Sequence, residues 1–481
     1  MVFNSVAFAI FFIVFFFLYW FVFSKTIKWQ NFLILAASYL FYSFTDWRFL
    51  AILILSSIFN YWVGIGIERS IRYRKLLLWM GMVQGIGSLI FFKYFNFFVN
   101  SFNTLFTSLN IHVNFQVLSI IVPVGISFFT FRTMSYLLDI DKGKIKASTN
   151  WVSFFAYVAF FPSLLSGPID KARTFMPQLE RRREFSYVMA ADGMRQILWG
   201  LFKKMVVADN CAIIADGIFS NYHDLPGSSL LMGAFFYTIQ MYADFSGYSD
   251  MAIGVSKLLG FNITPNFNFP FFARNIADFW RRWHISLTTW LTEYVFTPLS
   301  ITFRDLGKAG VSLAIIINFT LVGIWHGANW TYVAFGFMHG CYFIPLIIKG
   351  TMNKKKRVDK ESGFPALDHG LDIFKTFTLV MLTFVVFRAS SISDALQYYN
   401  ILFSQSLFST PVFLEKIIIV KASIFILIMM LMEWVQREQE HGLVLDYFKS
   451  PALRASVYCV LIFMIIWLGS TGANQFIYFN F

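Results

Sequence analysis

The chain has 481 residues, of which 57% are hydrophobic and only 14% are charged, and its mean hydropathy is +0.62. A soluble globular domain is about 25% charged, so this chain has too little charge to cover a water-exposed surface. The net charge of +13 is spread over short basic clusters between apolar runs, a pattern typical of cytoplasmic loops and not of nucleic-acid binding. The composition therefore predicts a polytopic membrane protein without a nucleic-acid partner.

Apolar runs along the chain predict the membrane helices. A spanning helix needs about 20 predominantly apolar residues. The runs that fit are 6–23, 31–43, 48–66, 77–93, 117–138, 229–245, 309–325, 330–349, 371–387, 416–434 and 453–471, with less regular apolar stretches at 94–110, 151–166 and 194–218. No long polar segment is left to fold separately. The sequence therefore predicts an all-α integral membrane protein with one domain over residues 1–481.

The positions of lysine and arginine predict the orientation in the membrane. Basic clusters mark cytoplasmic loops, and they occur after the first run at Lys25 and Lys28, at 68–75, at 142–146 and at 354–360. The loop 388–415 has few charges and is expected outside. We therefore expect a multi-pass protein of the cytoplasmic (inner) cell membrane whose two ends are extracytoplasmic.

One apolar stretch does not fit simple spanning. Residues 151–166 have basic loops on both sides, so both of their ends favour the cytoplasm. A re-entrant segment satisfies this, because irregular backbone is tolerated at membrane depth when protein covers it. An ordinary span that violates the charge rule is the alternative.

Residues 279–294 form the most informative segment. As one helix, they would place Arg282, Ser286, Thr289 and Glu293 on a single polar stripe, which indicates a helix lying in or near the membrane interface. His284 would then point away from the stripe into apolar surroundings. It is either a hydrogen-bonded core histidine or part of a site, because a buried polar group needs a partner in both cases.

A second histidine lies at the end of an apolar run. His326 falls at or just inside a membrane boundary, where an ionisable group is a candidate for function. Gly323 and Gly327 flank it, and glycine suits a place where a ligand approaches the backbone. His339, inside the next run, belongs to the same site or joins two helices.

Other chemistry finds little support. Asp244 and Asp250 are six residues apart, so they do not share a helix face, and polar packing or helix-end contacts are expected for them. The three cysteines are far apart, and no spacing predicts a metal site.

Neutral imidazole is the natural base near pH 7. Positioned against an alcohol it would take the hydroxyl proton during attack on a thioester, although a proton relay in a transporter fits the same residue.

The two histidine motifs carry a resemblance. Trp-Arg-Arg-Trp-His-Ile-Ser-Leu-Thr-Thr-Trp at 280–290 and Gly-Ile-Trp-His-Gly-Ala-Asn-Trp at 323–330 resemble the alginate O-acetyltransferase membrane subunits of the membrane-bound O-acyltransferase superfamily. This superfamily includes the peptidoglycan O-acetylation subunit and the teichoic acid D-alanyl transfer protein. Further similar motifs lie at 122–131, 161–168 and 244–254 and in the aromatic C-terminus.

The resemblance implies a helical bundle around a central funnel, with re-entrant and interfacial helices. It assigns catalysis to His326 and His284, and we place Trp325, Asn329, Arg281 and Arg282 at the substrate. Arg281 and Arg282, with Lys203 and Lys204, would either attract the phosphates of a cytoplasmic donor or serve as interfacial anchors. No cofactor is expected to stay bound, because acetyl-CoA would be a donor substrate.

The implied acceptor is an extracytoplasmic polysaccharide, reached through a separate extracytoplasmic acyltransferase partner. D-alanyl transfer toward teichoic acid from a carrier-protein donor is the alternative, and a non-enzymatic transporter or channel is a third possibility.

Overall fold

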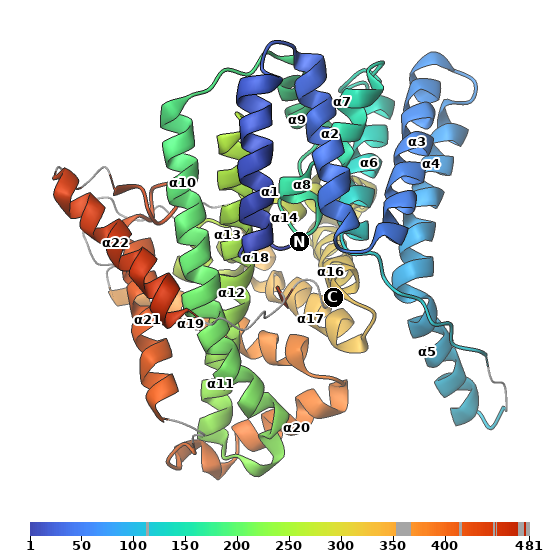
Figure 1. The fold of residues 1–481 in the computed structure, drawn as a ribbon. Coiled ribbons are helices and arrows are strands. Elements are labelled where there is room, and N and C mark those ends of the chain that lie inside the picture. Colours follow the sequence, from blue (N-terminus) through green and yellow to red (C-terminus); the bar gives the residue numbers. More distant parts are fainter. Residues whose placement is uncertain are drawn as a thin grey trace. The chain divides into compact units, whose positions relative to one another are not determined.

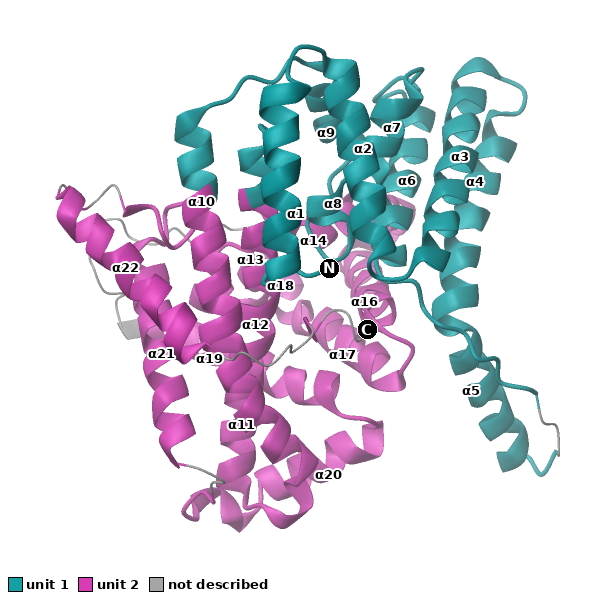
Figure 2. Cartoon of the chain, viewed as in Figure 1, with its two compact units in different colours: residues 1–193, 255–264 teal, residues 194–254, 265–481 magenta. Residues whose placement is uncertain are grey.

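The described part of the chain consists of helices and loops, without a β-strand. The computed structural model describes residues 1–111, 115–352, 367–412, 416–445, 448, 450–469 and 476–477. Two compact units are distinguished by their internal contacts (Figure 2): unit 1 holds residues 1–193 and 255–264, and unit 2 holds residues 194–254 and 265–481. The all-α prediction is confirmed for the described residues, and one domain over residues 1–481 stays a prediction.

Unit 1 contains the N-terminal helices (Figure 1). They are α1 (Val6–Phe17), α2 (Ile27–Ser43), α3 (Trp47–Arg69), α4 (Arg74–Leu89), α5 (Phe95–Ser108), α6 (Ile126–Asp141), α7 (Trp151–Val158), α8 (Phe161–Leu164) and α9 (Ala172–Glu180), with π-helical turns η1 (Leu18–Val22) and η2 (Ile90–Tyr94). Phenylalanines make much of this unit's packing, as where Phe11, Phe15 and Phe41 surround Phe161.

Two helices have residues in both units. They are α10 (Tyr187–Leu201) and α12 (Gly227–Leu258). Unit 2 adds η3 (Phe202–Ala208), α11 (Asp209–Ser220), α13 (Ile276–Arg282), α14 (Ile285–Leu291), η6 (Thr292–Phe296), α15 (Thr297–Thr302), α16 (Gly307–His326), α17 (Trp330–Tyr342), α18 (Ile344–Ile348), α19 (Leu367–Arg388), α20 (Ile392–Leu402), α21 (Lys416–Val435) and α22 (Pro451–Leu468). Short 3₁₀ turns are η4 (Tyr222–Asp224), η5 (Pro270–Phe272), η7 (Arg304–Leu306) and η8 (Gln405–Phe408).

Seven described stretches are long and apolar enough to cross a membrane. They are Trp47–Arg69, Arg74–Ser108, Arg304–His326, Trp330–Ile348, His369–Arg388, Lys416–Val435 and Pro451–Leu468, and Val6–Val22 is a shorter apolar helix. Their outer surfaces carry large apolar side chains, such as Trp62 and Trp467, at 65% and 73% exposure. Such exposure suits contact with lipid, and the multi-pass prediction is confirmed.

Two predicted segments are shorter than a span. The run 117–138 is helical only from Ile126, because Pro123 cannot donate a backbone hydrogen bond and Gly125 adopts φ +80°. A Cβ at Gly125 would lie 2.7 Å from the Leu164 carbonyl oxygen. The prediction of a full span at 117–138 is therefore wrong.

The stretch 151–166 forms two short helices, α7 and α8. The eight residues of α7 rise about 12 Å, far less than a hydrocarbon core of about 30 Å. Residues 158–166 are buried throughout. An ordinary span is excluded, and the geometry fits the re-entrant interpretation.

Candidate active site

His326 is placed by the close crossing of α16 and α17. A Cβ on Gly323 would overlap the carbonyl oxygen of Tyr332, and one on Gly336 would overlap that of Phe319. The two backbones are therefore in direct contact, and only glycine fits at the crossing. A Cβ on Gly327 would overlap the Tyr332 ring. The prediction that Gly323 and Gly327 make room for a ligand is wrong, because α17 fills that space.

His326 is the last residue of α16 and is 4% exposed. Its ring centroid lies 4.8 Å from that of Trp325, 5.1 Å from that of Phe387 and 6.2 Å from that of Phe335. These rings belong to α16, α19 and α17. The histidine thus sits in an aromatic pocket at the end of an apolar helix.

The chain breaks sharply at His284, so residues 279–294 are not one helix. α13 ends at Arg282, His284 adopts φ 44° and ψ 52°, and α14 begins at Ile285. Residues other than glycine are uncommon in this left-handed region, because the conformation is strained for them. Strained residues of this kind concentrate at functional sites. The predicted polar stripe does not form, because Ser286 is buried while Thr289 is exposed.

A short backbone pairing holds this break in place. The Ile285 amide donates to the Asn266 carbonyl at 2.9 Å, and the Asn268 amide donates to the Arg282 carbonyl at 2.9 Å. The segment after α12 therefore fixes both sides of the turn that carries His284.

The His284 side chain is fully buried, as its apolar surroundings predicted. Its Nδ1 lies 2.9 Å from Asn266 Oδ1, and its ring packs edge-on to Phe245 with centroids 4.7 Å apart. Burial lowers the pKa of His284 to about 3, so the ring is neutral at physiological pH.

Trp325 joins the two histidines. Its ring centroid is 5.5 Å from that of His284 and 4.8 Å from that of His326. Unit 2 thus brings His284, Trp325 and His326 together, although 41 residues lie between the histidines in the sequence. A buried pair of imidazoles with an aromatic wall is suited to moving a proton at a hydroxyl group.

The other predicted substrate residues make bonds within the protein. Arg282 Nε donates to Asp278 Oδ1 at 3.0 Å, and Arg281 donates to the Met352 carbonyl. Asn329 caps α17 by accepting from the Thr331 amide at 3.0 Å, and its Nδ2 donates to the Ser390 carbonyl at 2.8 Å. Contact of Arg281, Arg282 and Asn329 with substrate stays a prediction.

Lys203 and Lys204 are not available to a phosphate. They are 3% and 1% exposed. Lys203 Nζ lies 2.5 Å from Asp250 and 3.9 Å from Glu433, and Lys204 Nζ lies 2.6 Å from Asp244 and 2.9 Å from Asp209. The predicted phosphate attraction by these lysines is therefore wrong, as is their placement as interfacial anchors.

This buried ion cluster explains the two aspartates of α12. Asp244 and Asp250 reach consecutive lysines on η3, in agreement with the predicted polar packing. Glu433 was missed by the sequence argument. The signal for it was an acidic residue inside an apolar run, which marks a polar partner in a membrane protein.

His339 joins two helices. Trp280 Nε1 donates to His339 Nδ1 at 3.1 Å, which ties α13 to α17. The helix-joining role proposed for His339 is thereby confirmed. Because Phe335 packs against both His339 and His326, this bond also supports the pocket around His326.

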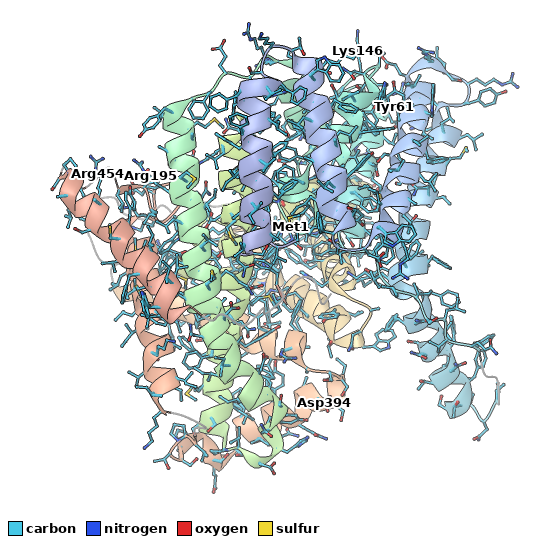
Figure 3. The ribbon with its side chains drawn as sticks, viewed as in Figure 1. Met1, Tyr61, Lys146, Arg195, Asp394 and Arg454 are labelled. Carbon is cyan, nitrogen blue, oxygen red and sulfur yellow. The ribbon has the colours of Figure 1, made fainter. Side chains whose placement is uncertain are left out.

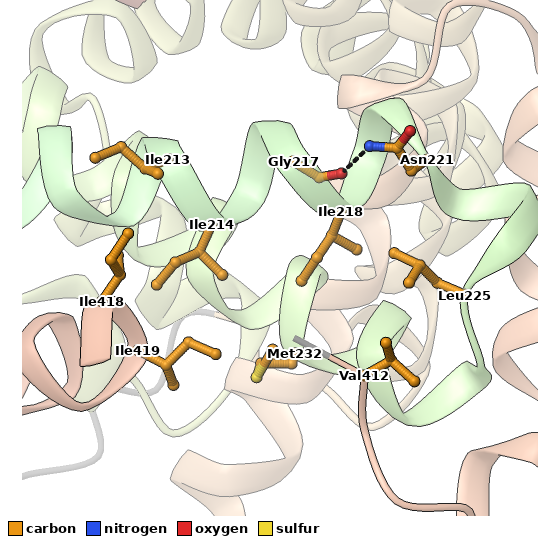
Figure 4. A pocket seen from close by; sticks show the side chains of 10 residues that line it. All are labelled: Ile213, Ile214, Gly217, Ile218, Asn221, Leu225, Met232, Val412, Ile418 and Ile419. Carbon is orange, nitrogen blue, oxygen red and sulfur yellow. Dashed lines mark hydrogen bonds between the residues drawn. The ribbon is translucent and has the colours of Figure 1, made fainter. Parts of the chain in front are cut away.

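An apolar cavity of about 250 Å³ lies elsewhere in unit 2 (Figure 4). It is lined by Ile213, Ile214, Gly217, Ile218, Asn221, Leu225, Met232, Val412, Ile418 and Ile419. No lining residue is ionisable, and the Asn221 amide already donates to the Gly217 carbonyl at 2.9 Å. The cavity offers no acid–base chemistry.

Comparison with known proteins identifies the class. The sequence model of MBOAT, the membrane-bound O-acyltransferase family, matches residues 141–355. "Probable alginate O-acetylase AlgI" of Azotobacter vinelandii is 36% identical over 411 residues, covering 84% of this chain and 78% of that protein. The peptidoglycan O-acetyltransferase of Helicobacter pylori is 34% identical over 410 residues, covering 78% and 74%. The chain belongs to the membrane-bound O-acyltransferase family.

A more distant relative belongs to a different acyl chemistry. The teichoic acid D-alanyltransferase of Streptococcus thermophilus is 32% identical over 292 residues, covering 55% of this chain and 68% of that protein. The matched family region contains His284, Trp325 and His326. The chain is thus a multi-pass membrane acyltransferase, and the transporter or channel alternative is set aside.

Proposed function

We propose that this chain takes an acetyl group from a cytoplasmic thioester, acetyl-CoA, and delivers it for O-acetylation of an extracytoplasmic polysaccharide. Relatives named for alginate and peptidoglycan O-acetylation cover more of the chain than those named for teichoic acid D-alanylation. A separate extracytoplasmic acyltransferase would complete the transfer. The observation that carries the proposal is the buried His284–Trp325–His326 arrangement at the end of an apolar helix.

In this proposal His326 is the general base. Its imidazole takes the proton of the acceptor hydroxyl as the oxygen attacks the thioester carbonyl. The new carbon–oxygen bond forms, the carbon–sulfur bond breaks, and the thiolate leaves and is protonated. No protein nucleophile is needed, and the surrounding rings exclude the water that would hydrolyse the thioester.

The His326→Gln variant tests this mechanism, because glutamine keeps size and some hydrogen bonding without a proton acceptor. Transfer from labelled acetyl-CoA is expected to fall at least about 100-fold, the low end of general-base effects. His223→Gln, an exposed histidine on η4, is the matched control with unchanged transfer.

Unfolding midpoints are measured on the same purified samples. A well-folded His326→Gln protein with near-normal transfer would remove His326 from the mechanism. Activity that appears only with a D-alanyl carrier protein as donor would establish D-alanyl transfer instead.

We also propose that the basic loops face the cytoplasm. The loops after α1, α3 and α6 lie at one end of unit 1, the last marked by Lys146 (Figures 1 and 3). In unit 2, Arg195 and Arg454 lie toward the end opposite Asp394 (Figure 3). The predicted cytoplasmic loop at 354–360 lies outside the described residues.

Thiol labelling checks this orientation in a background free of Cys211, Cys341 and Cys459. An impermeant reagent added to intact cells is expected to label Phe408→Cys, whose native side chain is 90% exposed, and to spare Lys146→Cys. The reverse pattern would invert the orientation.

A further inference from the structure

The side-chain amide of Asn266 contacts the turn at His284, in addition to the backbone hydrogen bond between Asn266 and Ile285. Asn266 is fully buried. Its Oδ1 lies 2.9 Å from His284 Nδ1, 2.9 Å from Ser286 Oγ and 3.4 Å from the Ser286 amide nitrogen. Its Nδ2 donates to Ser249 Oγ on α12 at 3.1 Å.

The orientation of this amide follows from its neighbours. A backbone N–H is only a donor, so the atom that faces the Ser286 amide must be the oxygen of Asn266. The nitrogen is then left for Ser249, whose hydroxyl can accept. An amide rotated by 180° would set two N–H groups against each other at Ser286.

The proton position on His284 follows from the same reasoning. An amide oxygen has no hydrogen to give, so His284 Nδ1 must carry the hydrogen that joins them. On a neutral ring, the lone pair then lies on Nε2.

We propose that Asn266 is a positioning residue that holds His284 as the Nδ1–H tautomer, so that Nε2 serves the acyl-transfer site as a hydrogen-bond acceptor. This inference deepens the proposed acyl transfer and rests on it for the meaning of the site. The tautomer itself is a property of the folded chain.

His339 shows that the fold also sets the opposite tautomer. The Trp280 indole N–H is only a donor, so His339 Nδ1 accepts from it and the hydrogen of a neutral ring lies on Nε2. Two buried histidines in one unit therefore present different groups at the same ring position. His284 offers an acceptor at Nε2, and His339 offers a donor.

Asparagine differs from aspartate at this position because its acceptor oxygen carries no negative charge. Aspartate would accept the same bonds from His284 and Ser286 and would cap α14 equally well. Its negative charge, however, would stabilise the imidazolium and raise the His284 pKa. The neutral amide fixes the tautomer without favouring protonation of Nε2.

Solid-state ¹⁵N NMR on histidine-labelled protein tests the tautomer directly. The His284 signals are identified by their loss in His284→Gln. We expect a protonated Nδ1 and an unprotonated Nε2 in the native protein near pH 7. A protonated Nε2 on neutral His284 would overturn the proposal.

Activity measurements test positioning against a purely structural role. Asn266→Ala is expected to lower kcat about 10- to 100-fold, by analogy with the outer-shell residues that orient metal-binding histidines. Ser249→Ala is the matched comparison, because it removes the bond at the nitrogen end of the same amide and leaves the bonds to His284 and Ser286. It is expected to lower folding stability by about 1–3 kcal/mol, since a buried N–H loses its partner, and to lower kcat less than Asn266→Ala does.

Asn266→Asp separates capping from tautomer control. The pH profile of His284 protonation, followed by its ¹⁵N signals, should move upward by at least about one pH unit, because a neighbouring carboxylate raises the imidazole pKa. The acceptor Nε2 is then lost as pH falls through the raised pKa. An unmoved profile with native kcat would show that Asn266 only caps α14 and would overturn the proposal.

The two proposals fail in different ways. If His326→Gln keeps full transfer while the NMR shows the Nδ1–H tautomer, the base assignment fails and the effect of Asn266 on His284 stands. If His326→Gln loses transfer and Asn266→Asp behaves as native, the positioning role fails and the base assignment stands.

Discussion

Two buried cationic sites, Arg132 in unit 1 and Lys203 with Lys204 in unit 2, are bonded to different kinds of group. In unit 1, Arg132 on α6 is 1% exposed. Its guanidinium donates to the carbonyls of Tyr157 at 3.3 Å, Val158 at 3.2 Å and Ser163 at 3.1 Å, with Pro168 at 3.4 Å. These bonds shape the short helices α7 and α8 around one arginine.

In unit 2, the buried lysines of η3 face carboxylates. Lys203 and Lys204 meet Asp250, Glu433, Asp244 and Asp209. Tyr242 adds a hydroxyl that lies 2.9 Å from both Glu433 oxygens. The cluster joins η3 and the first residue of α11 to α12 and α21, which lie further along the chain.

The difference lies in what remains when the cation is removed. Loss of Arg132 would leave several carbonyls without a donor and would remove a positive charge near one buried carboxyl, that of Asp170, whereas loss of a lysine would leave two carboxylates close together in a medium that screens charge poorly. Carbonyls suit a local bend in the chain, because the loop supplies them itself. Charge pairs suit contacts between helices that are far apart in the sequence.

Lys204→Met is expected to give the larger effect. Asp244 and Asp209 would face each other without a counter-charge, and breaking a buried pair in this way costs about 3–5 kcal/mol. Unfolding in mixed detergent micelles measures the loss. The double variant Lys204→Met/Asp244→Asn should recover part of the stability, because one uncompensated carboxylate is removed. A single variant within about 1 kcal/mol of native would mean that the lysine contributes no more than an exposed ion pair.

Arg132→Lys is expected to give the smaller effect. Lysine keeps the charge, but its ammonium has three donors and lacks the planar fork that reaches several carbonyls at once. The unpaired carbonyls should cost about 1–3 kcal/mol, measured by the same unfolding assay. Arg72→Lys, at an exposed position on the loop before α4, is the control and should be neutral. A loss for Arg132→Lys as large as that for Lys204→Met would contradict the distinction between dipoles and charges.

The sequence predicted the buried, apolar surroundings of the two histidines better than the path of the chain around them, and their catalytic role stays a prediction. His284 and His326 were found because a titratable ring in apolar sequence is costly unless it is used or bonded. Their common neighbour Trp325 follows from its place beside His326. Asn266 was missed, because an asparagine in a loop gives no periodic signal and its partner lies 18 residues away.

The predicted helix boundaries were wrong where tertiary contacts interrupt a helix inside an apolar run. Hydropathy treats 117–138 as one run and does not register the turn at Gly125, which packs against the Leu164 backbone. Amphipathic periodicity likewise assumes a regular helix through 279–294 and cannot show the left-handed residue at His284. Long spans such as α3, α16, α19 and α21 were predicted closely, because each is a continuous apolar run of the length needed to cross a membrane.

The close packing of α16 and α17 restricts three positions of this hairpin to glycine: Gly323, Gly336 and Gly340, where a Cβ would lie 2.7 Å from the Ile316 Cα. Main-chain atoms set the separation of the helices at Gly323 and Gly336, so no combination of larger residues can reproduce it by compensating elsewhere. Side chains on the outer faces of the same helices take no part in that spacing. The lipid-facing surface is therefore free to diverge among related proteins while His326 keeps its position, and a single added methyl group at Gly323 or Gly336 would displace it.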